Sequence, residues 1–184
     1  MTKYKTILAD PPWRYSNRTG KASPEHSRLH RYKTMSIDEL IKMKGFISEL
    51  SADQCHLYLW CTWPMISQGL ILMKEWGFEY KTGIPWLKVA KNGEPDGRSM
   101  GFYGRVVTEI LLFGVKTKQV FRTKPPHNKK NIFIAQRTKH SEKPNQQYSF
   151  IQSQSYGPYI ELFARNQVEG WDSHGDQIEI NTPQ

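Results

Sequence analysis

The sequence predicts an α/β fold with a mostly parallel sheet and helices on both faces. Segments typical of buried strands alternate along the chain with segments whose apolar residues repeat at helical spacing. The 184 residues are 38% hydrophobic and 23% charged, which suits one globular domain spanning residues 1–184 with one core. Ligands of such folds bind at the carboxyl ends of the strands, so residues placed there are the functional candidates.

The first strand is predicted over residues 4–9 (YKTILA), a short β-rich segment. Pro11 and Pro12 end it, because proline cannot continue a central strand. Asp10 is therefore expected at the carboxyl end of a strand. Residues 14–33 are polar and basic and predict a loop, whose length of about 20 residues points to function.

A capping box from Ser36 to Glu39 predicts the start of a helix that ends before Ser51. The nearly continuous apolar run over residues 55–61 (CHLYLWC) predicts a strand covered on both faces. The same criteria predict a helix over 66–76 ended by Gly77, strands over 79–89, 107–115 and 132–135, a turn over 91–97, a helix over 145–154 and a strand over 159–163.

Several classes of protein are not expected from the composition. Cys55 and Cys61 are the two cysteines, and we expect them to be reduced and buried. The six histidines show no metal-ligand spacing, so no metal is expected. No apolar run approaches the ~20 residues that cross a bilayer, and the amino terminus lacks a signal-peptide pattern. We therefore expect a cytoplasmic protein without a membrane partner.

Basic charge is concentrated in two segments of a chain whose net charge is +9. Residues 14–33 contain six Lys and Arg against one Glu, and residues 116–143 contain nine against one. We expect both to contact nucleic-acid phosphates as opposite walls of a groove leading to Asp10, with Lys129 and Lys130 among the contacts. The alternative for each segment is an ordinary solvated surface.

The strongest chemical signal is Asp10-Pro11-Pro12-Trp13, directly after a buried strand. An enzyme that methylates an exocyclic amine must orient a weak nucleophile. A carboxylate and a rigid backbone carbonyl, each accepting one amine hydrogen, would do so, and Trp13 offers a face for stacking a base. The alternative is a Pro-Pro turn beside a core tryptophan.

Beyond this motif, the sequence resembles the MT-A70 family of adenine-amine methyltransferases over nearly its whole length. The matching blocks are ILADPPWRY (7–15), YKTMSIDEL (32–40), LYLWCT (57–62), IPWLK (84–88), TEILLFGVK (108–116), HSEKP (140–144), PYIELFAR (158–165) and GWDSHGD (170–176). The resemblance implies a Rossmann-like class I methyltransferase fold with permuted motif order, catalysis by the motif Asp10 to Trp13, and S-adenosyl-L-methionine as cofactor.

The resemblance also implies roles for residues elsewhere in the chain. Lys143 resembles the lysine that meets the cofactor's carboxylate, although a solvated surface lysine is the alternative. Glu161 looks like the acid near the cofactor, Tyr32 like a gate-loop tyrosine beside the target base, and Trp86 is the tryptophan expected nearest a pocket. Asp10 of the catalytic motif is also expected to contact the cofactor, and Arg165, Asn166, Asp176 and Gln177 match the remaining cofactor positions more loosely.

Together these observations predict a DNA adenine-N6 methyltransferase. Two alternatives stay open: an RNA adenine-N6 methyltransferase, and an inactive nucleic-acid-binding subunit of the same fold. No separate recognition domain is visible, so specificity is expected to come from loops or from a partner, as a homodimer or a heteromeric complex.

Overall fold

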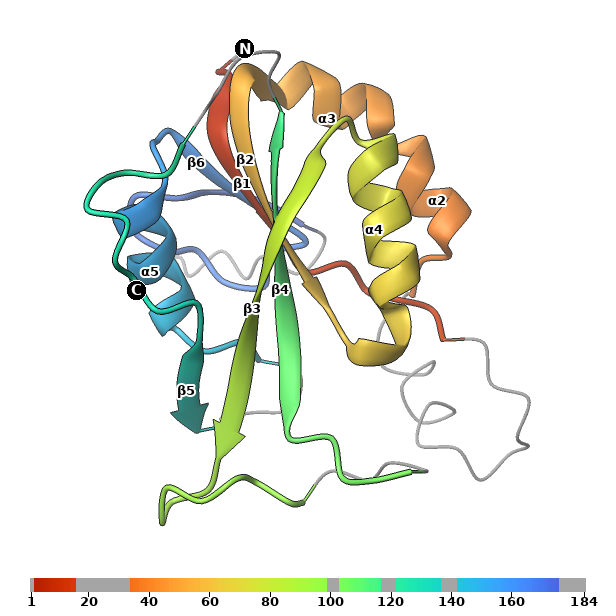
Figure 1. Ribbon diagram of the computed structural model, residues 1–184. Coiled ribbons are helices and arrows are strands. Elements are labelled where there is room, and N and C mark those ends of the chain that lie inside the picture. Colours follow the sequence, from red (N-terminus) through yellow and green to blue (C-terminus); the bar gives the residue numbers. More distant parts are fainter. Residues whose placement is uncertain (1, 16–33, 99–102, 117–121, 137–141, 176–184) are drawn as a thin grey trace, which may run out of the picture.

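The computed structural model describes residues 2–15, 34–98, 103–116, 122–136 and 142–175 (Figure 1). Seven strands form one sheet in the order β5-β3-β4-β2-β1-β6-β7. β4 is antiparallel to its neighbours β2 and β3, and all other neighbouring strands are parallel. The predicted mostly parallel α/β fold is confirmed. The strands are β1 (Tyr4–Ala9), β2 (Ser51–Cys61), β3 (Glu79–Val89), β4 (Thr108–Lys116), β5 (Phe133–Gln136), β6 (Tyr159–Leu162) and β7 (Asp172–His174).

Helices cover both faces of the sheet, as predicted. α2 (Ile37–Lys42), α3 (Lys44–Leu50) and α4 (Ile66–Glu75) lie on one face, and α5 (Gln146–Gln154) lies on the other (Figure 1). Successive residues of a strand point to opposite faces. Ile7 accordingly packs in the core under α2 to α4, while Leu8 packs in the core under α5.

One predicted helix is divided in the structure, and one strand, β7, was not predicted. The helix that begins at the capping box is divided into α2 and α3 at Met43, whose N–H bonds the Leu40 carbonyl three residues back and so tightens the turn. The capping box itself is present, because Ser36 N–H donates to Glu39 and Glu39 N–H donates to the Ser36 hydroxyl. β7 carries no apolar alternation in its sequence, and it forms by pairing with β6.

The alternation of strand and helix does not continue through the whole chain. β3 and β4 are consecutive antiparallel strands, and the described part of the connection between them holds no helix. Gly93, with a φ of 84°, and Pro95 form a turn there, and Pro95 bridges back to Val89. This turn was predicted from the sequence, but the reversal of β4 was not.

The fold brings several strand ends to one side of the sheet. β1, β2, β3 and β6 run in the same direction, so they end where the antiparallel β4 begins. We call this side the carboxyl edge. Among the described residues, no helix is both long and apolar enough to span a lipid bilayer.

Candidate active site

Asp10 lies at the carboxyl edge, as predicted, directly after β1. Ala9 is flanked by Leu59 of β2 and Leu162 of β6, so Asp10 leaves the middle of the sheet. Pro11 and Pro12 then turn the chain. The Pro11 carbonyl accepts the Trp13 N–H at 2.8 Å, and a carbonyl oxygen has a second lone pair for another donor.

Trp13 is fixed at the end of this turn. Its indole N–H donates to the Trp60 carbonyl at 3.0 Å, and the residue is 7% exposed. The backbone on either side of it bonds to Met35: Arg14 N–H donates to the Met35 carbonyl and Met35 N–H to the Pro12 carbonyl. Trp13 is therefore a core residue that supports the Asp10 turn, and it leaves little exposed ring face for stacking a base.

Lys143 lies beside Asp10 although 133 positions separate them. Its Nζ atom is 2.8 Å from Asp10 Oδ2 and 3.5 Å from Glu109 Oε2, and it lies 5.5 Å from the centre of the Trp60 ring. The Lys143 side chain is 12% exposed. It is not a solvated surface lysine, because it forms the centre of a partly buried charge cluster.

Glu109 extends this cluster to a second lysine. Glu109 Oε1 lies 2.6 Å from Lys88 Nζ, so the carboxylate contacts Lys88 and Lys143 together. Neither Glu109 nor Lys88 was predicted as a site residue. Glu109 lies within the block TEILLFGVK and Lys88 within IPWLK, both of which carried the family resemblance. A charged residue inside a mostly apolar strand was the feature of the sequence that could have identified each of them as a site residue.

The cluster shifts the pKa values of its members. Burial lowers the pKa of Lys143, but the carboxylates of Asp10 and Glu109 outweigh burial and the pKa is raised overall. Burial raises the pKa of Glu109, but Lys143 and Lys88 outweigh it and the pKa is lowered overall. Lys143 and Glu109 are therefore held in their charged forms.

Glu161 lies two strands away from β2, on β6 next to Leu8 of β1. The Tyr148 hydroxyl of α5 donates to Glu161 Oε2 at 2.9 Å. Burial raises the pKa of Glu161 to about 7, with Asp10 adding to the rise while Tyr148, Lys143 and Arg165 oppose it. The Glu161 carboxyl thus titrates near neutral pH.

The raised pKa of Glu161 predicts a pH dependence of stability. Between about pH 4.5 and pH 7 the unfolded chain ionises this group while the folded chain keeps it protonated, so rising pH disfavours folding. The loss reaches up to about 3 kcal/mol above pH 7. Urea unfolding across this pH range should show the wild-type free energy of unfolding falling relative to that of Glu161→Gln. Parallel curves for the two proteins would contradict the assignment.

The residues around Glu161 fit a cofactor that has hydroxyl and carboxylate groups. Ser173 of β7 pairs in register with Glu161, and its buried hydroxyl oxygen has no hydrogen-bond partner among the described residues. Arg165 follows β6 and is half-buried, and its charge acts on both Lys143 and Glu161. The Glu161 carboxyl, the Ser173 hydroxyl and the charged groups of Lys143 and Arg165 are therefore grouped at the carboxyl edge.

Other predicted site residues lie elsewhere. Trp86 is 1% exposed, donates its indole N–H to the Ala135 carbonyl at 3.1 Å and packs against Trp60, so it lies in the core and presents no accessible face. Asn166 is exposed in the turn after β6. The predicted positions outside the described residues are Asp176, Gln177 and residues 16–33 of the first basic segment, which include Tyr32.

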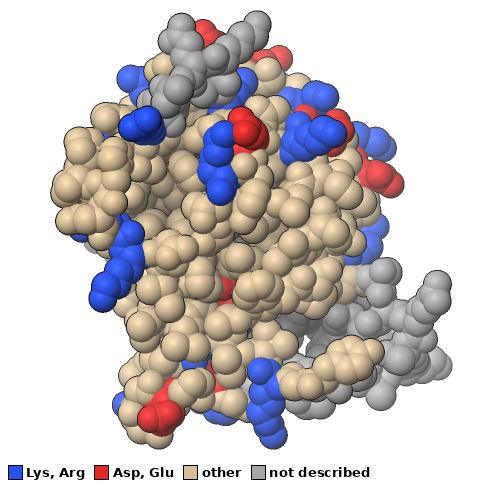
Figure 2. Space-filling model, viewed as in Figure 1, with Lys and Arg blue, Asp and Glu red and all other residues tan. Residues whose placement is uncertain are grey.

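The described residues of the second basic segment, 116, 122–136 and 142–143, do not lie together as one wall, contrary to the sequence-based expectation. Lys116 donates to the Ser51 hydroxyl at the side of the sheet opposite the carboxyl edge, and Lys124 donates to the Gln152 carbonyl at the end of α5. Lys129 and Lys130 are exposed before β5. Figure 2 shows basic side chains on several parts of the viewed face, with no continuous band.

The cysteines and histidines provide no alternative site in the described part of the chain. Cys55 and Cys61 are free and buried, as predicted, and burial raises the pKa of Cys55 to about 12. No group of three His, Cys, Asp or Glu side chains is arranged to hold a metal ion among the residues that the structure describes.

Comparison with known proteins matches the chain to one family of methyltransferases. The MT-A70 family model matches residues 4–177. The chain is 32% identical to the type II methyltransferase M.MunI of Mycoplasma sp., over 97% of the chain and 79% of that protein.

Two eukaryotic relatives match 95% of the chain. They are the N6-methyladenosine RNA methyltransferase MTA1 of Cryphonectria parasitica, at 26% identity, and the N(6)-adenine-specific methyltransferase METTL4 of Homo sapiens, at 27%. The chain spans 52% of the fungal protein and 37% of the human one.

Proposed function

The chain belongs to the MT-A70 family, and on that premise we propose that it methylates the exocyclic amine of adenine in DNA with S-adenosyl-L-methionine as methyl donor. One observation carries the proposal. Asp10, in the Asp-Pro-Pro-Trp turn at the carboxyl edge, is paired with the partly buried Lys143 and lies at the junction of the charge cluster with the Glu161 region.

Asp10 orients the nucleophile in this proposal. A carboxylate oxygen of Asp10 accepts one hydrogen of the amine, and the Pro11 carbonyl accepts the other through its second lone pair. These two acceptors turn the nitrogen lone pair away from the turn. The Asp10 carboxylate is also placed to take the proton that the amine loses as it becomes methylated.

Lys143 provides the positive charge that neutralises the Asp10 carboxylate while Asp10 orients the amine. Because Lys143 also contacts Glu109, it keeps a counter-ion when Asp10 engages an amine. Glu109 in turn is held by Lys88. Charges that are already fixed in place need little rearrangement during the reaction. This preorganisation is the main source of electrostatic catalysis.

In this proposal Lys143 and Arg165 bind the carboxylate of the cofactor, and Glu161 and Ser173 bind its hydroxyl groups. Asn166, Asp176 and Gln177 are further candidates from the family resemblance. S-adenosyl-L-methionine supplies an electrophilic methyl group on a sulfonium sulfur. The protein's contribution is to hold the amine in line with that methyl group and to exclude water.

The direct test is methyl transfer from labelled cofactor to matched DNA and RNA oligonucleotides, followed by mass spectrometry of the nucleosides. We expect N6-methyladenine in the DNA product. DNA is preferred because compact chains of this kind resemble bacterial or phage DNA enzymes, and M.MunI, a type II methyltransferase by name, is matched over most of its length.

Two other outcomes would change the proposal. Methylation of RNA alone would favour the RNA alternative, for which the match to the fungal RNA methyltransferase is the supporting observation. A folded protein that binds no cofactor in calorimetry would favour the inactive subunit. The charged cluster around Asp10 argues against that reading, because hydrophobic residues often stabilise a fold as well as a partly buried ion pair does, so a subunit without catalysis does not need these charges.

Lys129 and Lys130 are proposed phosphate contacts. Each phosphate contact adds about −0.9 to the log–log dependence of DNA affinity on salt. Changing both lysines to Ala should therefore flatten the slope by roughly one to two units and weaken binding to all sequences alike. Filter binding or fluorescence anisotropy at several salt concentrations measures this.

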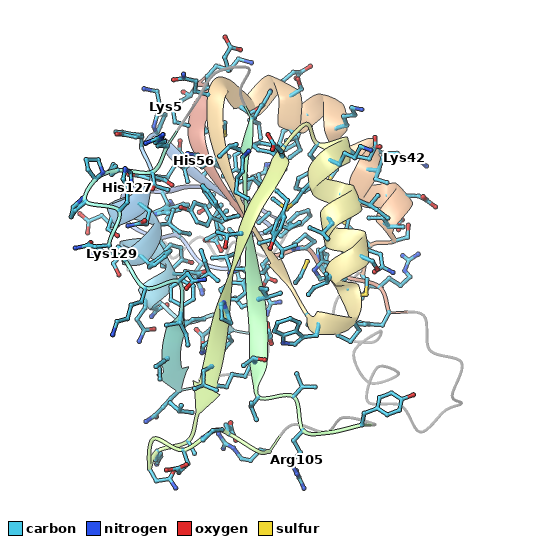
Figure 3. The ribbon with its side chains drawn as sticks, in the orientation of Figure 1. Lys5, Lys42, His56, Arg105, His127 and Lys129 are labelled. Carbon is cyan, nitrogen blue, oxygen red and sulfur yellow. The ribbon has the colours of Figure 1, made fainter. Side chains whose placement is uncertain are left out.

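The matched control removes the same charge elsewhere. Lys42 and Lys44 are exposed residues on and next to α2, and Lys42 lies on the opposite side of the molecule from Lys129 (Figure 3). Changing Lys42 and Lys44 to Ala should leave the slope unchanged. Equal slopes for the two double variants would mean that Lys129 and Lys130 are solvated residues without a role in binding.

A further inference from the structure

The connection between β3 and β4, described at residues 90–98 and 103–107, exposes an aromatic residue at the carboxyl edge. Tyr103 is 107% exposed, the highest value among the large apolar residues in the described ranges. Val106 of the same loop is 36% exposed, and Trp63, just after β2, is 45% exposed. Single exposed apolar residues are ordinary, but three at one edge suggest a contact surface.

This β3–β4 loop is held by specific bonds. The Asp96 side chain is buried, and its two carboxylate oxygens accept from the Arg98 guanidinium at 2.7 and 2.8 Å. Arg105 donates to the Gly97 carbonyl and so joins the two arms of the loop. Tyr103 therefore projects from a segment whose two arms are fastened together.

The base of the loop is bonded to the charge cluster of the active site. Lys88 N–H donates to the Val107 carbonyl at 2.8 Å, and Asp96 N–H donates to the Lys88 carbonyl at 2.7 Å. The side chain of the same Lys88 pairs with Glu109. The loop therefore projects from the edge at which Asp10 and Lys143 lie.

The loop also carries cations in contact with solvent. Lys91 and Arg105 are exposed, and Arg105 points away from the body of the molecule below the sheet (Figure 3). An aromatic ring next to cations is the combination that binds unstacked nucleotides, since the ring stacks on a base while the cations meet phosphates.

We infer that the β3–β4 loop contacts DNA beside the target adenine, with Tyr103 stacking on a neighbouring base and Arg105 near a phosphate. The inference rests on the proposed function. An adenine that reaches Asp10 must leave the base stack, which deprives its neighbours of a stacking partner. Tyr103 replaces part of that lost stacking, and because its edge of the protein is also the edge of Asp10, one strand can engage both.

The test compares three variants of the full chain on a short duplex that contains the methylation site mapped for the wild-type enzyme. Tyr103→Ala should weaken DNA binding by roughly tenfold, within the range for loss of one stacked base. Tyr103→Phe keeps the ring and should stay near wild type. Tyr80→Ala is the control, because Tyr80 is 43% exposed near the start of β3, at the opposite side of the sheet.

Three measurements separate the possible results: DNA affinity, cofactor affinity and sedimentation. We expect Tyr103→Ala to lose DNA affinity with cofactor affinity unchanged. DNA binding by Tyr103→Ala equal to that of Tyr80→Ala would overturn the inference, while methylation of DNA by the wild type would leave the proposed function standing. If the wild type sediments as a dimer and Tyr103→Ala sediments as a monomer with DNA affinity unchanged, the inference would also be overturned, and the loop would be assigned to contact with a second copy of the chain.

Discussion

Asp10→Asn is expected to reduce methyl transfer to DNA by at least about a hundredfold while the protein stays folded. Asparagine has nearly the same size, but its neutral amide is a poorer acceptor for an amine hydrogen and cannot take up the proton that the amine loses. Lys143 keeps Glu109 as a counter-ion in this variant, so the cluster is not left with an unpaired cation. Single-turnover transfer from labelled cofactor measures the effect, with circular dichroism to verify folding.

Asp53→Asn is the matched control for this change. Asp53 is exposed in the first part of β2, away from the carboxyl edge, and the substitution removes the same charge. We expect wild-type transfer rates. Full activity of Asp10→Asn under the same conditions would refute the central role of Asp10 in the proposed function.

Lys143→Met is expected to destabilise the protein by about 3 kcal/mol and to abolish cofactor binding. Methionine fills similar space but leaves the Asp10 and Glu109 carboxylates without their shared cation. The lowered pKa of Glu109 should then rise, because one of the two lysines that lower it is gone. Chemical unfolding at neutral pH and calorimetry with the cofactor measure the two effects.

Three further variants show whether this loss comes from the shared cation. Lys143→Arg keeps the positive charge and should recover part of the stability, and Lys143→Met combined with Glu109→Gln should be less destabilised than Lys143→Met alone. Lys44→Met breaks an exposed pair with Glu75 and should change stability by less than about 1 kcal/mol. If Lys143→Met destabilised no more than Lys44→Met, the cluster would have no energetic importance.

Several elements of the fold were predictable because their patterns are local. The strand over residues 79–89 was predicted with the bounds that β3 has in the structure, and Gly77 ends α4 with a φ of 85°. The capping box of Ser36 and Glu39 depends on residues three positions apart. Each of these features depends on residues that lie close together in the sequence.

Glu109 and Lys88 could not be placed in the site in the same way. Their proximity depends on the register in which β4 runs antiparallel to β3, with Glu109 opposite Trp86. The sequence gives no clear indication that β4 runs antiparallel to its neighbours, because its apolar run suits a parallel strand equally well. Lys143 likewise reaches Asp10 only when β1 and the segment before α5 meet at the carboxyl edge.

The sequence by itself determined that Asp10 follows a buried strand, that two prolines fix the turn after it, and that the chain resembles the MT-A70 family, as the family match confirms. These features depend on neighbouring residues or on the order of short motifs along the chain. Only the tertiary structure decided that Lys143 is partly buried between Asp10 and Glu109 and that Trp86 lies in the core. It also decided that the described residues of the second basic segment lie on separate parts of the surface. The reason is physical: charge pairing and burial depend on distances in space, and strand order and direction set these distances between residues far apart in the sequence.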